Sequence, residues 1–168
     1  MLQLKLAAAI VQTPGGTKGL LPGGEVYPAR VSKSEKVAAM VRACEGRGVD
    51  PYYAAYFEYF NRELFYEAHD ALEQLWLPVR KAADGAFYKG LIQLAGAFVH
   101  LQKNRLAPAV ALFKLARANL AGFGAVHLQF DVAAALALID AWQGSLEKNR
   151  LQINPLTPAT APKLALLA

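Results

Sequence analysis

The chain has 168 residues and a formal net charge of +5 at pH 7, with 55% hydrophobic and 18% charged residues. This composition is too apolar for an intrinsically disordered chain, and the length fits one domain of ordinary size. The single cysteine, Cys44, excludes an internal disulfide and any multi-cysteine zinc or iron–sulfur site.

Residues 1–31 are predicted to form an irregular N-terminal extension. The stretches TPGG and LPGGEVYPAR within it are rich in proline and glycine, which interrupt both helices and strands. The first residues, MLQLKLAAAIVQT, carry one lysine and a short apolar run, which is less than a secretory signal or a spanning helix requires. We therefore expect a cytoplasmic protein with no membrane partner.

A helical domain is expected over residues 32–148. Ser32 and Glu35 have the spacing of a capping box, so the first helix is predicted to begin at Ser32. Cys44 continues an apolar stripe on this helix, which favours a small buried hydrophobic residue over a reactive thiol. The other members of the stripe are Val37, Met40 and Val41.

Asp50 and Pro51 predict the start of a second helix, because aspartate caps helices well and proline is favoured at the first helical position. Aromatic residues crowd one broad side of this helix, and such a stripe is typical of a core rather than of a ligand platform. They are Tyr52, Tyr53, Tyr56, Phe57, Tyr59 and Phe60.

Four further helices complete the prediction. Asn61 is expected to cap a third helix that Pro78 closes, Pro108 to open the fifth, and Asp131 to cap the last. The expected ranges are about 62–77, 86–103, 108–121 and 132–147. His127 falls in the predicted loop GAVHLQF and is expected to be incidental.

The last segment, residues 149–168, is a proline-rich tail that we expect either to wrap the surface or to stay mobile. Short helices joined by short loops then predict the all-α class, as a compact bundle of about five to six short helices.

The third predicted helix contains the polar residues of greatest interest. His69 and Glu73 are four residues apart, so they are neighbours at the edge of the apolar face, and Tyr66 and Asp70 stand just beyond them.

On the fourth predicted helix, Lys89, Gln93, Gly96 and His100 fall in a narrow line opposite the apolar side. Gly96, together with Gly90, leaves room for another backbone to approach closely. One hypothesis is therefore a polar seam in which His69 and Glu73 face Gln93 and His100.

Three interpretations of this seam are open. It is a solvated face, a buried hydrogen-bond network without a ligand, or a site for a metal ion or small ligand. For the last, His69, Glu73 and His100 offer two imidazoles and a carboxylate, a sufficient ligand set for zinc or a similar divalent metal. The His-x-x-x-Glu spacing is common by chance and differs from the zincin motif.

Two segments, FNRELFYEAHDALEQLW and FYKGLIQLAGAFVHLQKNRLAPAVALFKLA, resemble the uncharacterised domain-of-unknown-function family 309 over about residues 51–147. The family signature is Glu-Ala-His-Glu-x-Leu-Glu-x-x-Trp after a Phe-Asn turn, followed by a Gly-Leu-Ile-Gln-Leu-Ala helix with a downstream histidine. Asp70 stands where the family usually has glutamate, and Glu63 stands where glycine is common.

The resemblance implies a compact all-helical fold of bacterial and plastid proteins, and it supplies no activity. It also implies that His69, Glu73, Gln93 and His100 belong to the signature. This argues against a merely solvated face and leaves the buried network and the ligand site as alternatives.

Two functions remain as hypotheses. The first is a protein that binds a metal ion or small ligand and has a hydrolytic activity. The second is a non-enzymatic structural or interaction module that forms a homo-oligomer or joins an assembly. Basic residues on the fourth and fifth helices are scattered, as on a solubilising face, so we do not expect nucleic-acid binding. They are Lys89, Lys103, Arg105, Lys114 and Arg117.

Overall fold

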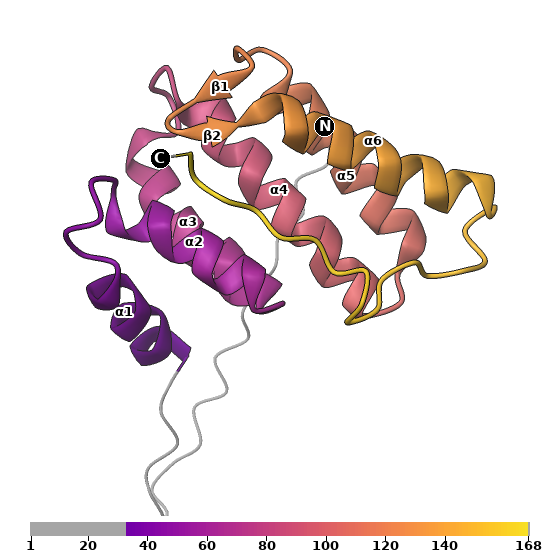
Figure 1. Cartoon of the computed structure of the whole chain (residues 1–168), viewed down its shortest axis with the longest axis horizontal. Helices are drawn as coiled ribbons and strands as arrows, with labels where there is room; N and C mark the ends of the chain where they lie inside the picture. Colours follow the sequence, from indigo (N-terminus) through magenta and orange to yellow (C-terminus); the bar gives the residue numbers. More distant parts are fainter. Residues whose placement is uncertain (1–32, 168) are drawn as a thin grey trace, which may run out of the picture. The chain divides into compact units, whose positions relative to one another are not determined.

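The computed structural model describes residues 33–167, which form six helices and one short hairpin (Figure 1). The elements are α1 (Lys33–Ala43), α2 (Pro51–Asn61), α3 (Phe65–Val79), α4 (Gly85–Gln102), α5 (Leu106–Leu120), β1 (Val126–His127), β2 (Phe130–Asp131) and α6 (Val132–Lys148). This confirms the all-α class and the number of helices. Of these helices, none has the length and apolar character needed to cross a membrane. The expected N-terminal extension and the Ser32 cap lie outside the described residues.

Each helix from α1 to α6 packs on the next helix in the chain, and α4 lies between α3 and α5. The predicted apolar side of α4 is confirmed, because every one of its residues is fully buried. These residues are Phe87, Leu91, Leu94, Ala95, Phe98 and Leu101. The position of α4 between two other helices explains why so much of its surface is apolar.

The start of α2 is formed as predicted. The carboxylate of Asp50 accepts hydrogen bonds from the backbone N–H groups of Tyr52 and Tyr53, and Pro51 is the first helical residue. Except for Tyr52, the predicted aromatic residues of α2 are buried, so the stripe is core. The hydroxyl of Tyr56 in this stripe is buried and donates a hydrogen bond of 2.9 Å to the carbonyl of Leu91 on α4. Cys44 is also fully buried, as expected.

The turn between α2 and α3 differs from the prediction. Asn61 does not cap the next helix; it ends α2, and its side chain binds the backbone N–H and C=O of Leu164, each at 2.7 Å. The third helix therefore begins at Phe65, with Leu64 exposed at the cap position. Asn61 does not cap α3 because its side chain is bound by a segment remote in sequence.

Pro78 does not end α3 but lies inside its last turn, since the helix continues to Val79. A proline there removes only one hydrogen bond, to the carbonyl of Gln74, and Gln74 is exposed so that water can replace the lost donor. Likewise, α5 begins at Leu106, and Pro108 occupies its first turn, where a missing N–H is tolerated.

Glu63 adopts a φ of 61° in the α2–α3 turn, in the left-handed region that favours glycine. This is the position at which glycine is common in the resembling family. We expect Glu63→Gly to raise the free energy of unfolding by about 0.5–1 kcal/mol, because the strain relieved exceeds the extra freedom that glycine gives the unfolded chain. Urea denaturation followed by circular dichroism measures the change.

Asn104 provides the matched control, because it has a φ of 53° and asparagine tolerates this region well. Asn104→Gly should change stability by less than Glu63→Gly does. Equal effects of the two substitutions would contradict the assignment of strain to Glu63.

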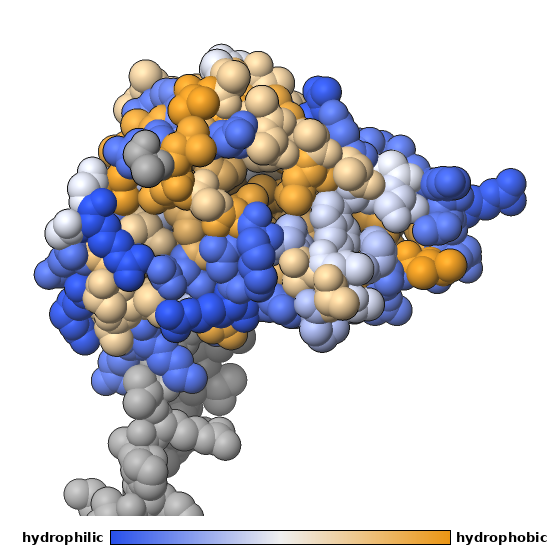
Figure 2. Space-filling model, in the orientation of Figure 1, coloured by the Kyte–Doolittle hydropathy of each residue, from blue (hydrophilic) through white to orange (hydrophobic). Residues whose placement is uncertain are grey.

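The predicted loop around His127 contains the hairpin. Leu128 and Gln129 both have positive φ, as a two-residue type I′ turn requires, and pair His127 with Phe130. Phe130 also bridges Leu166, so the C-terminal segment lies against the hairpin. Figure 2 shows hydrophobic residues gathered around this end of the chain.

Candidate metal centre

The local sequence of α3 sets the orientation of the candidate residues. Phe65, Ala68, Ala71 and Leu72 are fully buried and fix one side of the helix against the core. The side chain of His69 is 33% exposed, so it lies at the border of the buried side, as the spacing predicted. Glu73 follows one turn later at the same border and is half-buried.

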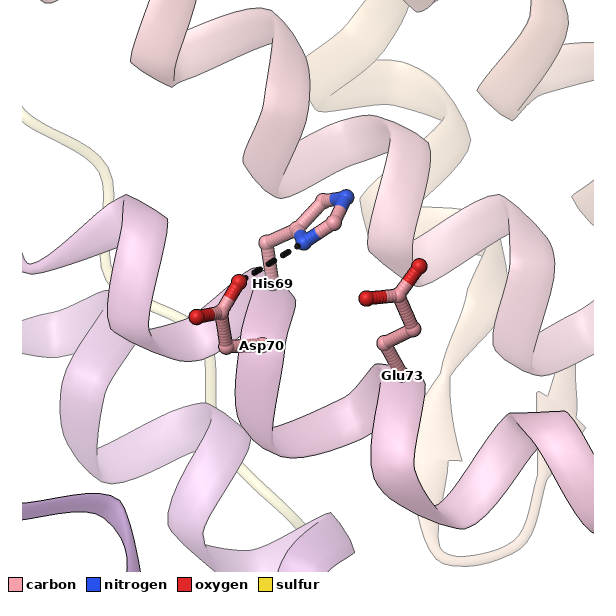
Figure 3. Close-up of side chains that lie close together, drawn as sticks. All are labelled: His69, Asp70 and Glu73. Carbon is pink, nitrogen blue, oxygen red and sulfur yellow. Dashed lines mark hydrogen bonds and ion pairs between the residues drawn. The ribbon is translucent and has the colours of Figure 1, made fainter. Parts of the chain in front are cut away.

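His69, Asp70 and Glu73 form one group in which one ligand atom from each residue lies within 4.8 Å of the other two. The Nδ1 atom of His69 is 3.4 Å from the Oδ1 atom of Asp70. Figure 3 shows the imidazole standing between the two carboxylates. For comparison, ligand atoms in a tetrahedral zinc site with bonds of about 2.0–2.1 Å are about 3.4 Å apart.

Tyr66 continues this surface toward the start of α3. Its ring stacks on His69, with the ring centroids 6.4 Å apart, and the ammonium of Lys103 lies 5.7 Å from the Tyr66 centroid. Because Lys103 follows the last residue of α4, the beginning of α3 lies beside the end of α4, and the two helices run antiparallel.

The structure does not bring His100 into the group of three ligands. His100 is half-buried near the end of α4, and its Nδ1 atom is enclosed without a hydrogen-bond partner. Burial lowers the pKa of this imidazole, and the positive charges of Arg105 and Lys103 lower it further. The neutral form of His100 is therefore favoured in the folded protein.

Gln93 is held by α5. Its Oε1 accepts a hydrogen bond of 2.7 Å from Asn119. Gly96 of the predicted line and the nearby Gly90 also face α5, because a Cβ at Gly90 would lie 2.7 Å from Leu120 and one at Gly96 would lie 3.1 Å from Leu112. The expected backbone approach is found at Gly90, where the carbonyl oxygen of Ala116 on α5 would lie 3.3 Å from the Cβ, whereas at Gly96 the close atom belongs to a side chain.

Two polar pairs, His127 with Asp84 and Asn119 with Gln93, join elements that no local sequence pattern connects. The Nε2 atom of His127 lies 2.8 Å from the carboxylate of Asp84, and the His127 ring packs on Phe87 and Phe123. His127, which was expected to be incidental, therefore has a packing role, because its ring fastens the hairpin to the start of α4. Asn119, on α5, was also not singled out. Neither residue lies in a motif, so only the packing of the helices reveals them.

Comparison with protein families identifies one match, which covers residues 53–112 and is described as Domain of unknown function (DUF309). No curated protein and no solved structure matches the chain. The matched residues run from α2 into α5 and contain His69, Asp70 and Glu73 together with Gln93 and His100. The family model matches residues 53–112, and these contain the two motifs on which the resemblance to this family was predicted.

Proposed function

We propose that the protein binds a divalent transition-metal ion, such as zinc, through His69, Asp70 and Glu73. The observation that carries this proposal is the convergence of their three ligand atoms within 4.8 Å. One imidazole and two carboxylates suit zinc and its neighbours in the first transition series. His100, the third ligand expected from the sequence, is replaced in this proposal by Asp70.

The partial exposure of the group supports a reactive site over a purely structural one. Three protein ligands leave one tetrahedral position open, and a metal ion lowers the pKa of water bound there to about 7. The side chains of His69 and Asp70 are 33% and 28% exposed, so small molecules can reach them. Hydrolysis of an ester or phosphoester bond is the chemistry that such a centre supplies.

Zinc titration by isothermal calorimetry tests the metal site. We expect the wild-type chain to bind one equivalent, and His69→Ala or Glu73→Gln to weaken binding at least tenfold, because each removes a ligand. Glu67→Gln is the matched control: it removes the same charge from the same helix, and Glu67 is not in the ligand group. It should leave the affinity unchanged.

Thermal melts of the metal-free variants separate the two alternatives of the sequence analysis. In a metal site, both variants keep the melting temperature of the wild type, since the ligands do not hold the fold together. If the wild type binds no zinc while both variants lose about 1–3 kcal/mol of stability, the residues form a structural network instead. Loss of bis(p-nitrophenyl) phosphate hydrolysis in His69→Ala would support the hydrolytic step.

A further inference from the structure

A second polar site lies where the end of α3, the start of α4 and the end of α5 meet. A cavity of about 350 Å³ is lined there by three basic side chains, one amide and one indole. They belong to Arg80, Lys81, Lys89, Asn119 and Trp76. No aspartate or glutamate lines this cavity.

The three cations of the cavity are not neutralised within the described part of the chain. None of them lies in an ion pair, whereas the neighbouring Lys114 and Arg117 on α5 pair with Glu147 and Asp140 on α6. The nearby carboxylate of Asp84 is bound to His127. The cavity therefore concentrates positive charge that an anionic ligand would balance.

The walls of the cavity are fixed by their own contacts. The indole N–H of Trp76 donates to the carbonyl of Gly85 at 3.0 Å, so the ring is held at the junction of α3 and α4. Asn119 donates through Nδ2 to Gln93 and to the carbonyl of Leu115. Its Oδ1 atom is left to accept a hydrogen bond, which a ligand hydroxyl can donate.

We propose that this cavity binds a phosphate monoester of a small hydroxylated molecule. The guanidinium of Arg80 and the ammonium groups of Lys81 and Lys89 contact the phosphate, while Trp76 and Asn119 contact the organic part. A volume of about 350 Å³ falls in the range of small-molecule sites, about 300–1,000 Å³.

A nucleic acid fits these observations less well. Backbone binding needs a row of free cations along a surface, and the next basic side chains on α5, Lys114 and Arg117, are occupied by carboxylates. The site is also distinct from the metal ligands, because none of His69, Asp70 and Glu73 lines this cavity. Arg80, the residue that follows α3, lies seven residues after Glu73, which is about 10 Å along a helix axis. The inference therefore does not depend on the proposed function.

The fluorescence of Trp76 reports on the cavity directly. The chain has two tryptophans, so in a Trp142→Phe background Trp76 is the single emitter. Titration with ribose 5-phosphate should give a saturable change, inorganic phosphate a weaker one, and ribose none. Arg80→Gln or Lys89→Gln should raise the dissociation constant at least tenfold.

Lys148→Gln is the matched control, because it removes one positive charge from α6, outside the cavity. It should change the dissociation constant less than twofold, and His69→Ala should leave it unchanged even if zinc binding is lost. The proposal is overturned if no saturable change occurs, or if Lys148→Gln weakens binding as much as Lys89→Gln. Tighter binding of a short single-stranded oligonucleotide, lowered equally by all three lysine and arginine variants, would also overturn it.

Discussion

Replacing Phe98 with alanine is expected to lower the free energy of unfolding by about 3–5 kcal/mol. The ring of Phe98 on α4 is fully buried and contacts aromatic rings from four other helices. They are Phe60 of α2, Phe65 of α3, Phe113 of α5 and Trp142 of α6, with centroid distances of 4.9–5.4 Å. Because the neighbours belong to separate helices, they cannot all close in on the cavity left by the truncation.

Urea denaturation followed by circular dichroism measures this loss, which is a large part of the roughly 5–15 kcal/mol that stabilise a typical domain. Leu115→Ala is the control, because Leu115 is 49% exposed on α5. It should cost less than about 0.5 kcal/mol. A loss below 1 kcal/mol for Phe98→Ala would show that the ring is not the common contact of the bundle.

The second large effect is expected from a single methyl group. Gly85 begins α4, and a Cβ at this position would lie 2.4 Å from the backbone carbonyl oxygen of Arg80. A backbone atom cannot rotate away as a side chain does, so the start of α4 must shift relative to the end of α3. We expect Gly85→Ala to lower the free energy of unfolding by about 2–3 kcal/mol.

Gly144 provides a control of the same chemistry. It lies within α6, and nothing stands within 4 Å of its ideal Cβ position. Gly144→Ala should therefore stabilise the protein by about 0.5–1 kcal/mol, the ordinary gain of alanine over glycine inside a helix. Opposite signs for the two substitutions in the same denaturation assay would confirm the close contact at Gly85. The same sign for both would refute it.

The periodic part of this fold was predictable from the sequence. The six residues of the predicted apolar side of α4 were identified by their spacing alone, and the Asp50-Pro51 and Asp131 caps mark two helix starts correctly. These features are local, because a helix repeats every 3.6 residues and a cap acts within one turn. They need no knowledge of the rest of the molecule.

Two features that the sequence did not predict depend on a remote partner. Asn61 has the right residue type for a helix cap, but it binds Leu164, 103 residues later. His127 lies in a segment without a helical pattern, and Asp84, its partner, is 43 residues earlier. No spacing within a single helix reveals such pairs.

In the candidate site, too, contacts within one helix were predictable and contacts between helices were not. His69 and Glu73 share one edge of α3, as their four-residue spacing requires, and they lie in the ligand group. Whether His100 or Asp70 completes a ligand set depends on how α4 slides and rotates against α3. That register is decided by side chains such as Phe65 and Phe98, which stack with centroids 5.0 Å apart.

The hydrogen bonds of the C-terminal segment have a consequence for the order in which the molecule is completed. Asn154 binds the carbonyl of Leu101 at the end of α4, and Leu164 and Leu166 attach to Asn61 and Phe130. Contacts between residues so distant in sequence form slowly, because a long loop must close before they are made. During synthesis, the surfaces of α2 and the hairpin that Leu164 and Leu166 contact therefore stay uncovered until these residues have left the ribosome.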